Sequence, residues 1–448
     1  MSGYSFESLF HLDALAQVLM ALVGFIGLVV WLFARRYMQG DQHYHRFLGL
    51  LVLLVFSVMT MAAADHLLFL LFTWGISNAL LVCLMVHKAQ WKAARASGWV
   101  TARIFLFGFI LLSSAFALLF YTTGATSVQT IVKTSSGGTW PVTVALILMG
   151  LAAMVQSAIW PFHGWLLSSL NSPTPVSAIM HAGLVNGGGF LLVRFAPLYI
   201  NQSTLLMGLF VLGIATALIG TFWKLMQPNI KRMLACSTMG QMGFMLAQCG
   251  LGLFPAAVAH LCWHGMFKAF LFLGSGSAAQ EKRLPTGAPP DALTFLLALV
   301  CGLAGSYGFA LASHQTWMAM DTTLVLTAVA CIAGSQFALT FLPATPWKRF
   351  PLALILTSLM GGLYGSSVWL VEIVLEPLHL MQPQPLNAIH LTGVLALGLV
   401  WVGMVFGHTL CQSRILPRTF LKVYVKALNA SQPHPDTITT HRNTYRYV

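Results

Sequence analysis

Long apolar stretches separated by short polar breaks run through almost the whole chain. A helix needs about 20 mainly apolar residues to cross the hydrocarbon core of a bilayer. We expect thirteen such helices, at residues 14–34, 46–64, 66–87, 99–121, 141–160, 174–198, 203–223, 234–252, 255–278, 290–313, 319–342, 351–376 and 388–411. The pattern predicts an all-α polytopic membrane protein, with a transmembrane domain over 1–411 and a polar tail over 412–448.

Charged residues are scarce, which agrees with this prediction. The 448 residues include 23 Lys and Arg and 10 Asp and Glu, or 7% of the chain, whereas soluble domains carry roughly 25%. A soluble protein of this length would need a charged surface that this sequence lacks. The formal charge of +13 would suit a nucleic-acid partner, but the positions of the basic residues exclude that interpretation.

The basic residues lie in alternate breaks between the predicted spans. If the N-terminus is outside, 20 of the 23 Lys and Arg fall on the cytoplasmic side, Lys133 and Arg194 fall outside, and Lys268 lies within a span. Retention of basic residues in cytoplasmic loops sets membrane orientation. We therefore expect an outer N-terminus, a cytoplasmic C-terminus and the lipid bilayer as surroundings.

Ionisable side chains within the spans are the first candidate site. A central Lys costs about 2.5–3.5 kcal/mol on the insertion scale, so such a residue is a functional candidate. Lys268 lies near the centre of the ninth span, and His260 and His264 precede it at intervals of four. The three side chains share a helix stripe about 12 Å long, which predicts a proton path. Alternatively, the histidines satisfy polar neighbours and Lys268 snorkels or pairs. His181 in the sixth span suits a relay or a packing residue equally.

Further candidates lie at the span ends. Pro161 removes a backbone donor, which predicts a helix break shortly after Gln156. Broken membrane helices often mark ion pathways, although a kink alone would have the same signature. Asp65 and Glu372 are candidates for the outer mouth of the path, or are solvated, and Lys224 is the remaining candidate. No motif predicts catalysis, a metal site or a cofactor in this chain, so we do not expect it to be an enzyme by itself.

Two segments resemble a known family. Residues 156–194, with SPTPVSAIMHA, and residues 229–279, with IKRMLACSTMGQMGF, resemble the proton-conducting membrane subunits of complex I (NuoL-like) and of Mrp antiporters. With AAADHLLFLLFTWG at 62–75, the resemblance covers most of residues 46–280. It implies inverted five-helix repeats, each with a broken helix, and a buried chain of Lys, His and acidic residues that includes His181, His260, His264, Lys268 and Asp65.

The sequence departs from this family at three positions, and these departures narrow the range of expected functions. Gly75 stands where the respiratory subunits carry a buried Glu, Gln156 stands where they carry a broken-helix Lys, and the tenth span lacks the expected Lys. These substitutions argue against ordinary respiratory pumping.

The end of the tail, LNASQPHPDTITTHRNTYRY, resembles DabB-like membrane subunits of inorganic-carbon accumulation systems. This resemblance implies a bacterial inner-membrane location and a large soluble DabA-like partner that resembles a zinc carbonic anhydrase. Cation flow through the membrane subunit would then drive hydration of CO2 to bicarbonate. The candidate docking residues are Pro433, His434, Pro435, His441 and Arg442, although a disordered end would share this composition.

Two other functions stay open. The chain could be a subunit of a respiratory complex or a multisubunit cation/proton antiporter, or it could be an anchor that holds a soluble enzyme at the membrane without conducting.

Overall fold

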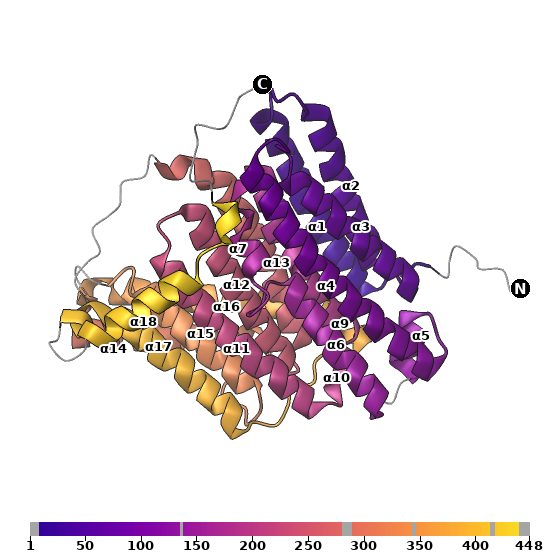
Figure 1. Ribbon diagram of the computed structural model, residues 1–448. Coiled ribbons are helices and arrows are strands. Elements are labelled where there is room, and N and C mark those ends of the chain that lie inside the picture. The colour runs from indigo at the N-terminus through magenta and orange to yellow at the C-terminus, as the bar shows by residue number, and fades with distance from the viewer. Residues whose placement is uncertain (1–8, 135–137, 280–288, 343–345, 413–416, 439–448) are drawn as a thin grey trace, which may run out of the picture. The chain divides into compact units, whose positions relative to one another are not determined.

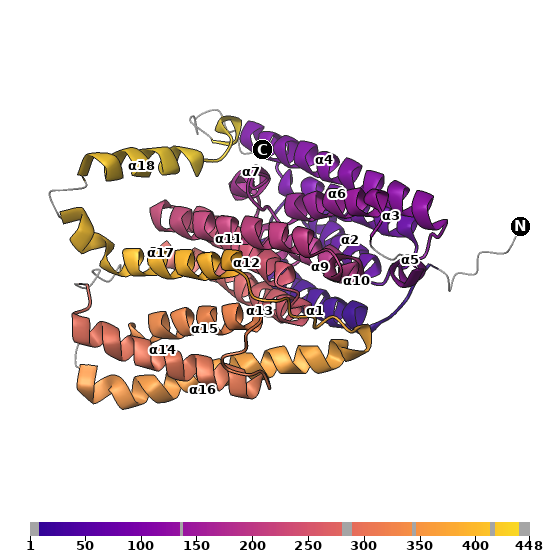
Figure 2. The ribbon, with the colours of Figure 1, turned by 90° about the horizontal axis from the view of Figure 1, so that it is seen from below.

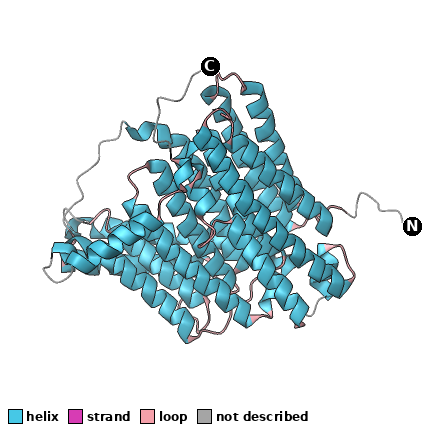
Figure 3. Cartoon of the chain, viewed as in Figure 1, coloured by secondary structure: helices cyan, strands magenta, loops and turns pink. Residues whose placement is uncertain are grey.

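The computed structural model describes residues 9–134, 138–279, 289–342, 346–412 and 417–438. Over these residues the regular structure is helical, with loops between the helices and no strands (Figure 3). One or more helices lie at each of the thirteen predicted spans, so the predicted all-α membrane fold is confirmed. Backbone contacts divide the chain into two compact units: residues 1–246, 260–281 and 430–448, and residues 247–259 and 282–429.

Ten helices of the described chain are long and apolar enough to cross a membrane. The helices α6 (Trp140–Gln156) and α15 (Thr323–Ala338) are shorter apolar helices. The remaining predicted span, 234–252, corresponds to α12 (Ile230–Gly250), a 21-residue helix that carries Thr238, Gln241 and Gln248 among its apolar residues.

The first unit begins with four long helices. They are α1 (Ala14–Tyr37), α2 (Tyr44–Ala62), α3 (Leu67–Met85) and α4 (Lys92–Thr123). Successive helices of this group pack against each other, and α1, α2 and α3 run side by side (Figure 1). The Asp13 carboxylate accepts the Ala16 N–H at 2.9 Å and caps α1, while Arg35 and Arg36 lie in its last turn. The acidic cap at the start and the two basic residues at the end all complement the helix dipole.

Two interrupted helices follow in the same unit. The first consists of α6, a non-helical stretch that contains Pro161, and the short helices α7 (Gly164–Leu167) and η2 (Ser169–Asn171). The second interruption is not evident in the sequence: the predicted span 174–198 is divided into α8 (Thr174–Ala182), η3 (Leu184–Asn186), α9 (Gly187–Arg194) and α10 (Ala196–Ile200). The unit also contains α11 (Ser203–Met226), most of α12, and the larger part of α13 (Phe254–Leu273).

Close backbone contact holds the two interrupted helices together. A Cβ atom on Gly188 of α9 would collide with the Ala153 carbonyl oxygen and the Ser157 hydroxyl at the end of α6. The Ser157 hydroxyl also donates to the Val185 carbonyl at 2.7 Å. Only glycine allows this approach, which places the two interruptions beside each other.

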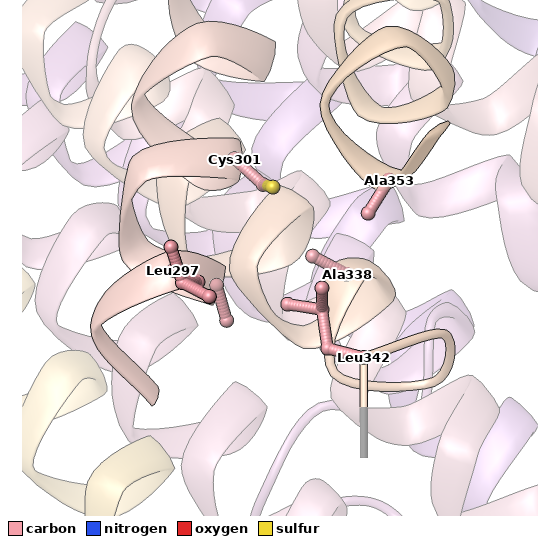
Figure 4. Packing of buried hydrophobic residues seen from close by; sticks show 6 residues of the cluster. Leu297, Cys301, Ala338, Leu342 and Ala353 are labelled. Atoms are coloured by element: carbon pink, nitrogen blue, oxygen red, sulfur yellow. The ribbon is translucent and has the colours of Figure 1, made fainter. Parts of the chain in front are cut away.

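The second unit is built from α14 (Ala292–Ala312), α15, α16 (Pro346–Leu375), η5 (Glu376–Leu378), α17 (Ala388–Gln412) and α18 (Pro417–Ala430). The helices α14, α15 and α16 lie side by side (Figure 2). Small side chains make this packing close, because Cys301, Ala338 and Ala353 come from three different helices and meet in one apolar cluster (Figure 4). Leu297, Ala298 and Leu342 complete the cluster.

Two segments are more ordered than their composition suggests. The Thr- and Ser-rich segment near residues 122–140 contains the helix α5 (Val128–Thr134), whose Val128 and Ile131 are buried. The tail contains α18, which the sequence interpretation missed, and the short helix η6 (Pro435–Thr437).

Candidate functional site

The helix α13 presents its three ionisable side chains inside the first unit. His260, His264 and Lys268 are 8%, 5% and 0% exposed. The rings of His260 and His264 stack with centroids 6.0 Å apart and an interplanar angle of 17°. The spacing of four residues therefore produces a buried stripe, and the protein retains an amine in a region without solvent contact.

A polar chain links Lys268 to His181. The Lys268 Nζ donates to the Leu234 carbonyl of α12 at 3.2 Å, and the Thr238 hydroxyl donates to the same carbonyl at 3.0 Å. The Thr238 Oγ1 lies 3.1 Å from Nδ1 of His181. Because the single hydroxyl hydrogen points to Leu234, the His181 Nδ1 donates to Thr238 in this arrangement. The ring of His181 stacks on Phe272 of α13 at 4.2 Å.

The other two histidines each keep one nitrogen without a protein partner. His264 bonds to the backbone of His181, and His260 bonds to the backbone of Gln241. The Nε2 atoms of both rings are buried and have no hydrogen-bond partner among the described residues. A buried polar atom without a partner usually serves a specific role or binds water. Two imidazoles with such atoms, in line with an amine, can pass protons through bound water.

Gln156 forms a different type of contact at the end of α6. Its side-chain amide exchanges two hydrogen bonds with the Asn78 amide, at 3.2 and 3.0 Å, and also donates to the Leu184 carbonyl at 3.4 Å. Both side chains are buried. This neutral amide pair stands at the helix break, and neither group can exchange a proton near neutral pH.

The helix break itself occurs at Gln156, five positions before Pro161. Gly75 lies on the same helix as Asn78, and a Cβ added there would meet the Phe109 ring at 3.3 Å, so this ring would have to shift slightly. The neighbourhood of the amide pair is therefore packed by apolar groups.

The remaining predicted path residues are not in the stripe. Asp65 accepts hydrogen bonds from the Ser127 hydroxyl at 2.6 Å and the Gln129 amide at 3.0 Å, which makes it an N-terminal cap for α5. Lys224 is exposed in the last turn of α11. Glu372 is half-buried on α16 of the second unit.

The predicted docking segment is partly seated on the first unit. The His434 amide donates to the Ser168 hydroxyl at 3.1 Å, and the Asn171 side chain donates to the Thr437 carbonyl at 2.9 Å. Pro433 is buried, whereas His434 and Pro435 are exposed. His441 and Arg442 lie outside the described residues.

Sequence reasoning missed Thr238, Leu234 and Asn78. Thr238 lies seven residues after Lys231 on a helix that carries other polar residues, and this pattern is only a weak indication of a functional residue. The Leu234 contact uses a backbone atom and leaves no signal in the sequence. Asn78 lies 78 residues from Gln156, so their pairing depends on the fold.

Two family models match the chain. The family model "NADH:quinone oxidoreductase/Mrp antiporter, TM" matches residues 64–287. The model "NADH-Ubiquinone oxidoreductase (complex I), chain 5 N-terminus" matches residues 1–48. The first match includes the stripe, the amide pair and both helix interruptions.

Individual relatives include two carbon transporter subunits. The chain is 40% identical over 298 residues to the "Probable inorganic carbon transporter subunit DabB1" of Halothiobacillus neapolitanus, covering 64% of this chain and 53% of the relative. It is 40% identical over 280 residues to the DabB protein of Bacillus subtilis, covering 62% and 55%. The chain thus matches only about half the length of these relatives.

A quinone oxidoreductase subunit and an antiporter structure are also similar. The chain is 32% identical over 301 residues to the chloroplastic NAD(P)H-quinone oxidoreductase subunit 5 of Brachypodium distachyon, covering 65% of this chain and 40% of the relative. The structure of the Mrp complex from Dietzia sp. matches 95% of this chain and 45% of its own, with a TM-score of 0.56 and 24% identity. This last likeness supports the fold.

Proposed function

The chain belongs to the NADH:quinone oxidoreductase/Mrp antiporter family of membrane proteins, and from this premise we propose that it is the ion-conducting membrane subunit of an inorganic-carbon accumulation complex. Protons or sodium ions would flow through it to drive hydration of CO2 by a soluble zinc-containing partner. Its similarity to two DabB proteins supports the substrate class.

The observation that carries conduction is the buried stripe of α13. Lys268 has no exposed surface, and a buried amine is costly unless function retains it. The stripe connects through Leu234 and Thr238 to His181, so ionisable groups of two helices form one continuous chain. A chain that only anchored a soluble enzyme would need none of them.

The distribution of basic residues supports the orientation. We propose that the ends rich in Lys and Arg face the cytoplasm of a bacterial inner membrane, so that cations enter from outside. Each elementary charge that crosses 100 mV releases about 2.3 kcal/mol, which shifts a coupled equilibrium by roughly 1.7 decades. Modest coupling is therefore enough to favour bicarbonate.

The seated tail supports the partner proposal. One edge of the segment binds the first unit through Ser168 and Asn171, while His434, Pro435 and Asp436 remain exposed. A tail fixed in this way presents its exposed edge at a defined place, which suits docking of a soluble subunit better than a free end does.

A second candidate is a subunit of a multisubunit cation/proton antiporter or a quinone-reducing complex. The family match and the similarity to a subunit 5 protein favour it. The amide pair of Asn78 and Gln156 favours the first proposal, because the two side chains at the helix break are neutral and do not form an ion pair.

Ion flux through reconstituted protein tests conduction. We expect the wild-type protein or its complex in liposomes to pass protons or sodium under an imposed potential, as measured with ion-sensitive dyes. Lys268→Ala should lower the initial rate at least about a hundredfold, the scale of a lost proton-transfer group. Lys92→Ala, at an exposed position, is the matched control and should keep the wild-type rate.

The outcomes separate the hypotheses. No flux through the wild-type protein would support the anchor, and equal flux through Lys268→Ala would exclude the stripe from the path. Purification in mild detergent, followed by zinc analysis, tests the partner: a large zinc protein supports the carbon complex, whereas several small membrane subunits or a quinone reductase support the second candidate.

A further inference from the structure

A polar cavity opens at the end of the first unit where α1 finishes. It has a volume of about 540 Å³ and is lined by the segment that joins α1 and α2, the segment that joins α3 and α4, η2 with the two residues after it, and the first turn of α12. The acidic and basic side chains of the lining are Asp41, His87, Lys88 and Lys231. None of them was a candidate from the sequence.

One face of α12 connects this cavity with the stripe. Lys231 lines the cavity, the Leu234 carbonyl accepts from Lys268, and Thr238 bonds to His181. These positions are i, i+3 and i+7, so they share a face of the helix. At 1.5 Å per residue, Leu234 and Thr238 lie about 4.5 and 10.5 Å along the axis from Lys231. The Lys231 Nζ also donates to the Ser172 carbonyl in the cavity wall at 3.1 Å.

An acid–base pair stands at the other side of the cavity. The Nε2 of His87 lies 3.0 Å from Oδ1 of Asp41, and the two side chains are 6% and 21% exposed. The His43 amide donates to the same carboxylate oxygen at 2.8 Å. The His87 ring packs edge-on against buried Phe47 at 5.0 Å. The pair is thus held in place by protein contacts while its carboxylate stays accessible.

We propose that this cavity is the cytoplasmic mouth of the ion path and that the Asp41–His87 pair is its proton-exchange site. This inference rests on the proposed conduction and adds its entry and exit group. His87 takes up one proton from water in the cavity and returns it to cytoplasmic water, so no other reactant is needed. Lys231 and α12 then join the cavity to Lys268.

The surrounding charges suit this role. Burial opposes ionisation of Asp41, but the His43 amide, the His87 ring and the charge of Lys88 together hold the pKa of this carboxyl below its usual value. Asp41 is therefore an anion near neutral pH and can accept a hydrogen bond from the His87 ring. The other titratable groups that face His87 are His43, whose ring centroid lies 6.3 Å away, and Lys231 of α12 across the cavity.

Proton flux in liposomes tests the proposal with the full chain. Asp41→Asn combined with His87→Gln should lower the initial rate at least about tenfold at neutral pH, because the path loses its surface exchange group. His45→Gln is the control: its side chain is exposed on α2, outside the cavity lining. Equal rates for the double variant and the wild-type protein would overturn the proposal.

Chemical rescue distinguishes proton exchange from a structural role. For His87→Gly, added imidazole should restore most of the lost flux, since the cavity is large enough to admit it. Loss of flux without restoration by imidazole would overturn the proposal, because it would show that His87 only supports the fold.

A variant that keeps the pair intact covers the case of misfolding. In a Cys83→Ser background, Gln39→Cys places a thiol at an exposed position of the cavity lining. A bulky thiol reagent should then block flux, whereas the Cys83→Ser parent treated in the same way should not change. Unblocked flux would exclude the cavity from the path. If the wild-type protein itself does not conduct, the proposed function fails rather than this inference alone.

Discussion

The first unit contains two buried polar regions that differ in how far the hydrogen-bonding capacity of their side chains is satisfied. At the end of α6, Asn78 and Gln156 satisfy each other through two amide hydrogen bonds. On α13, His260 and His264 each keep a buried Nε2 atom without a partner in the described structure. Both regions lie beside interrupted helices, and both are buried.

This difference separates a structural contact from a transfer path. A reciprocal amide pair stabilises the helix break and has no proton to exchange. The stripe has an amine, two open imidazole nitrogens and a bonded connection to His181, which are the groups that proton transfer requires. Burial of polar residues alone does not identify a path; the state of their hydrogen bonds does.

Near the amide pair, the largest loss of stability is expected from a substitution at Gly188. A Cβ here collides with the Ala153 carbonyl and Ser157, and one colliding atom belongs to the backbone and cannot rotate away. We expect Gly188→Ala to lower the free energy of unfolding by about 3 kcal/mol, the upper part of the usual range for overpacking. Thermal unfolding in detergent measures the loss.

Gly208→Ala is the matched control. Gly208 lies within α11, and a Cβ there meets nothing within 4 Å. Because alanine favours helices more than glycine does, this variant should be unchanged or slightly stabilised. A similar loss in both variants would mean that the approach of α9 to α6 has no special importance.

The amide pair itself predicts a characteristic pattern of stability. Asn78→Leu alone leaves the buried Gln156 amide without its main partner and should cost about 1–3 kcal/mol, whereas adding Gln156→Met should restore most of that loss. Ion flux should stay near the wild-type rate in both variants. If the double variant lost flux as severely as Lys268→Ala, the pair would belong to the path.

The fold and the buried stripe of α13 were predictable from the sequence. Apolar length predicted the helices, and the spacing of His260, His264 and Lys268 placed them on one face, because both signals are local. The partners were not predictable: Leu234 contributes a backbone atom, and Asp41 lies 46 residues from His87. The helix α18 was missed because its basic residues hid an amphipathic pattern within a polar tail.

The smallest expected effect concerns the Asp41–His87 pair at the cavity. The contribution of its carboxylate to the stability of the protein depends on pH. The folded pKa of Asp41 is lowered, and the unfolded value is about 3.9. Its contribution to stability is therefore complete above the unfolded pKa and is lost as pH falls through the folded pKa. Because the group is partly exposed, we expect this contribution to be less than about 1 kcal/mol.

Unfolding midpoints measured from neutral to acid pH should fall less steeply for Asp41→Asn than for the wild-type protein. Equal slopes would mean that His87 and Lys88 do not stabilise this carboxylate.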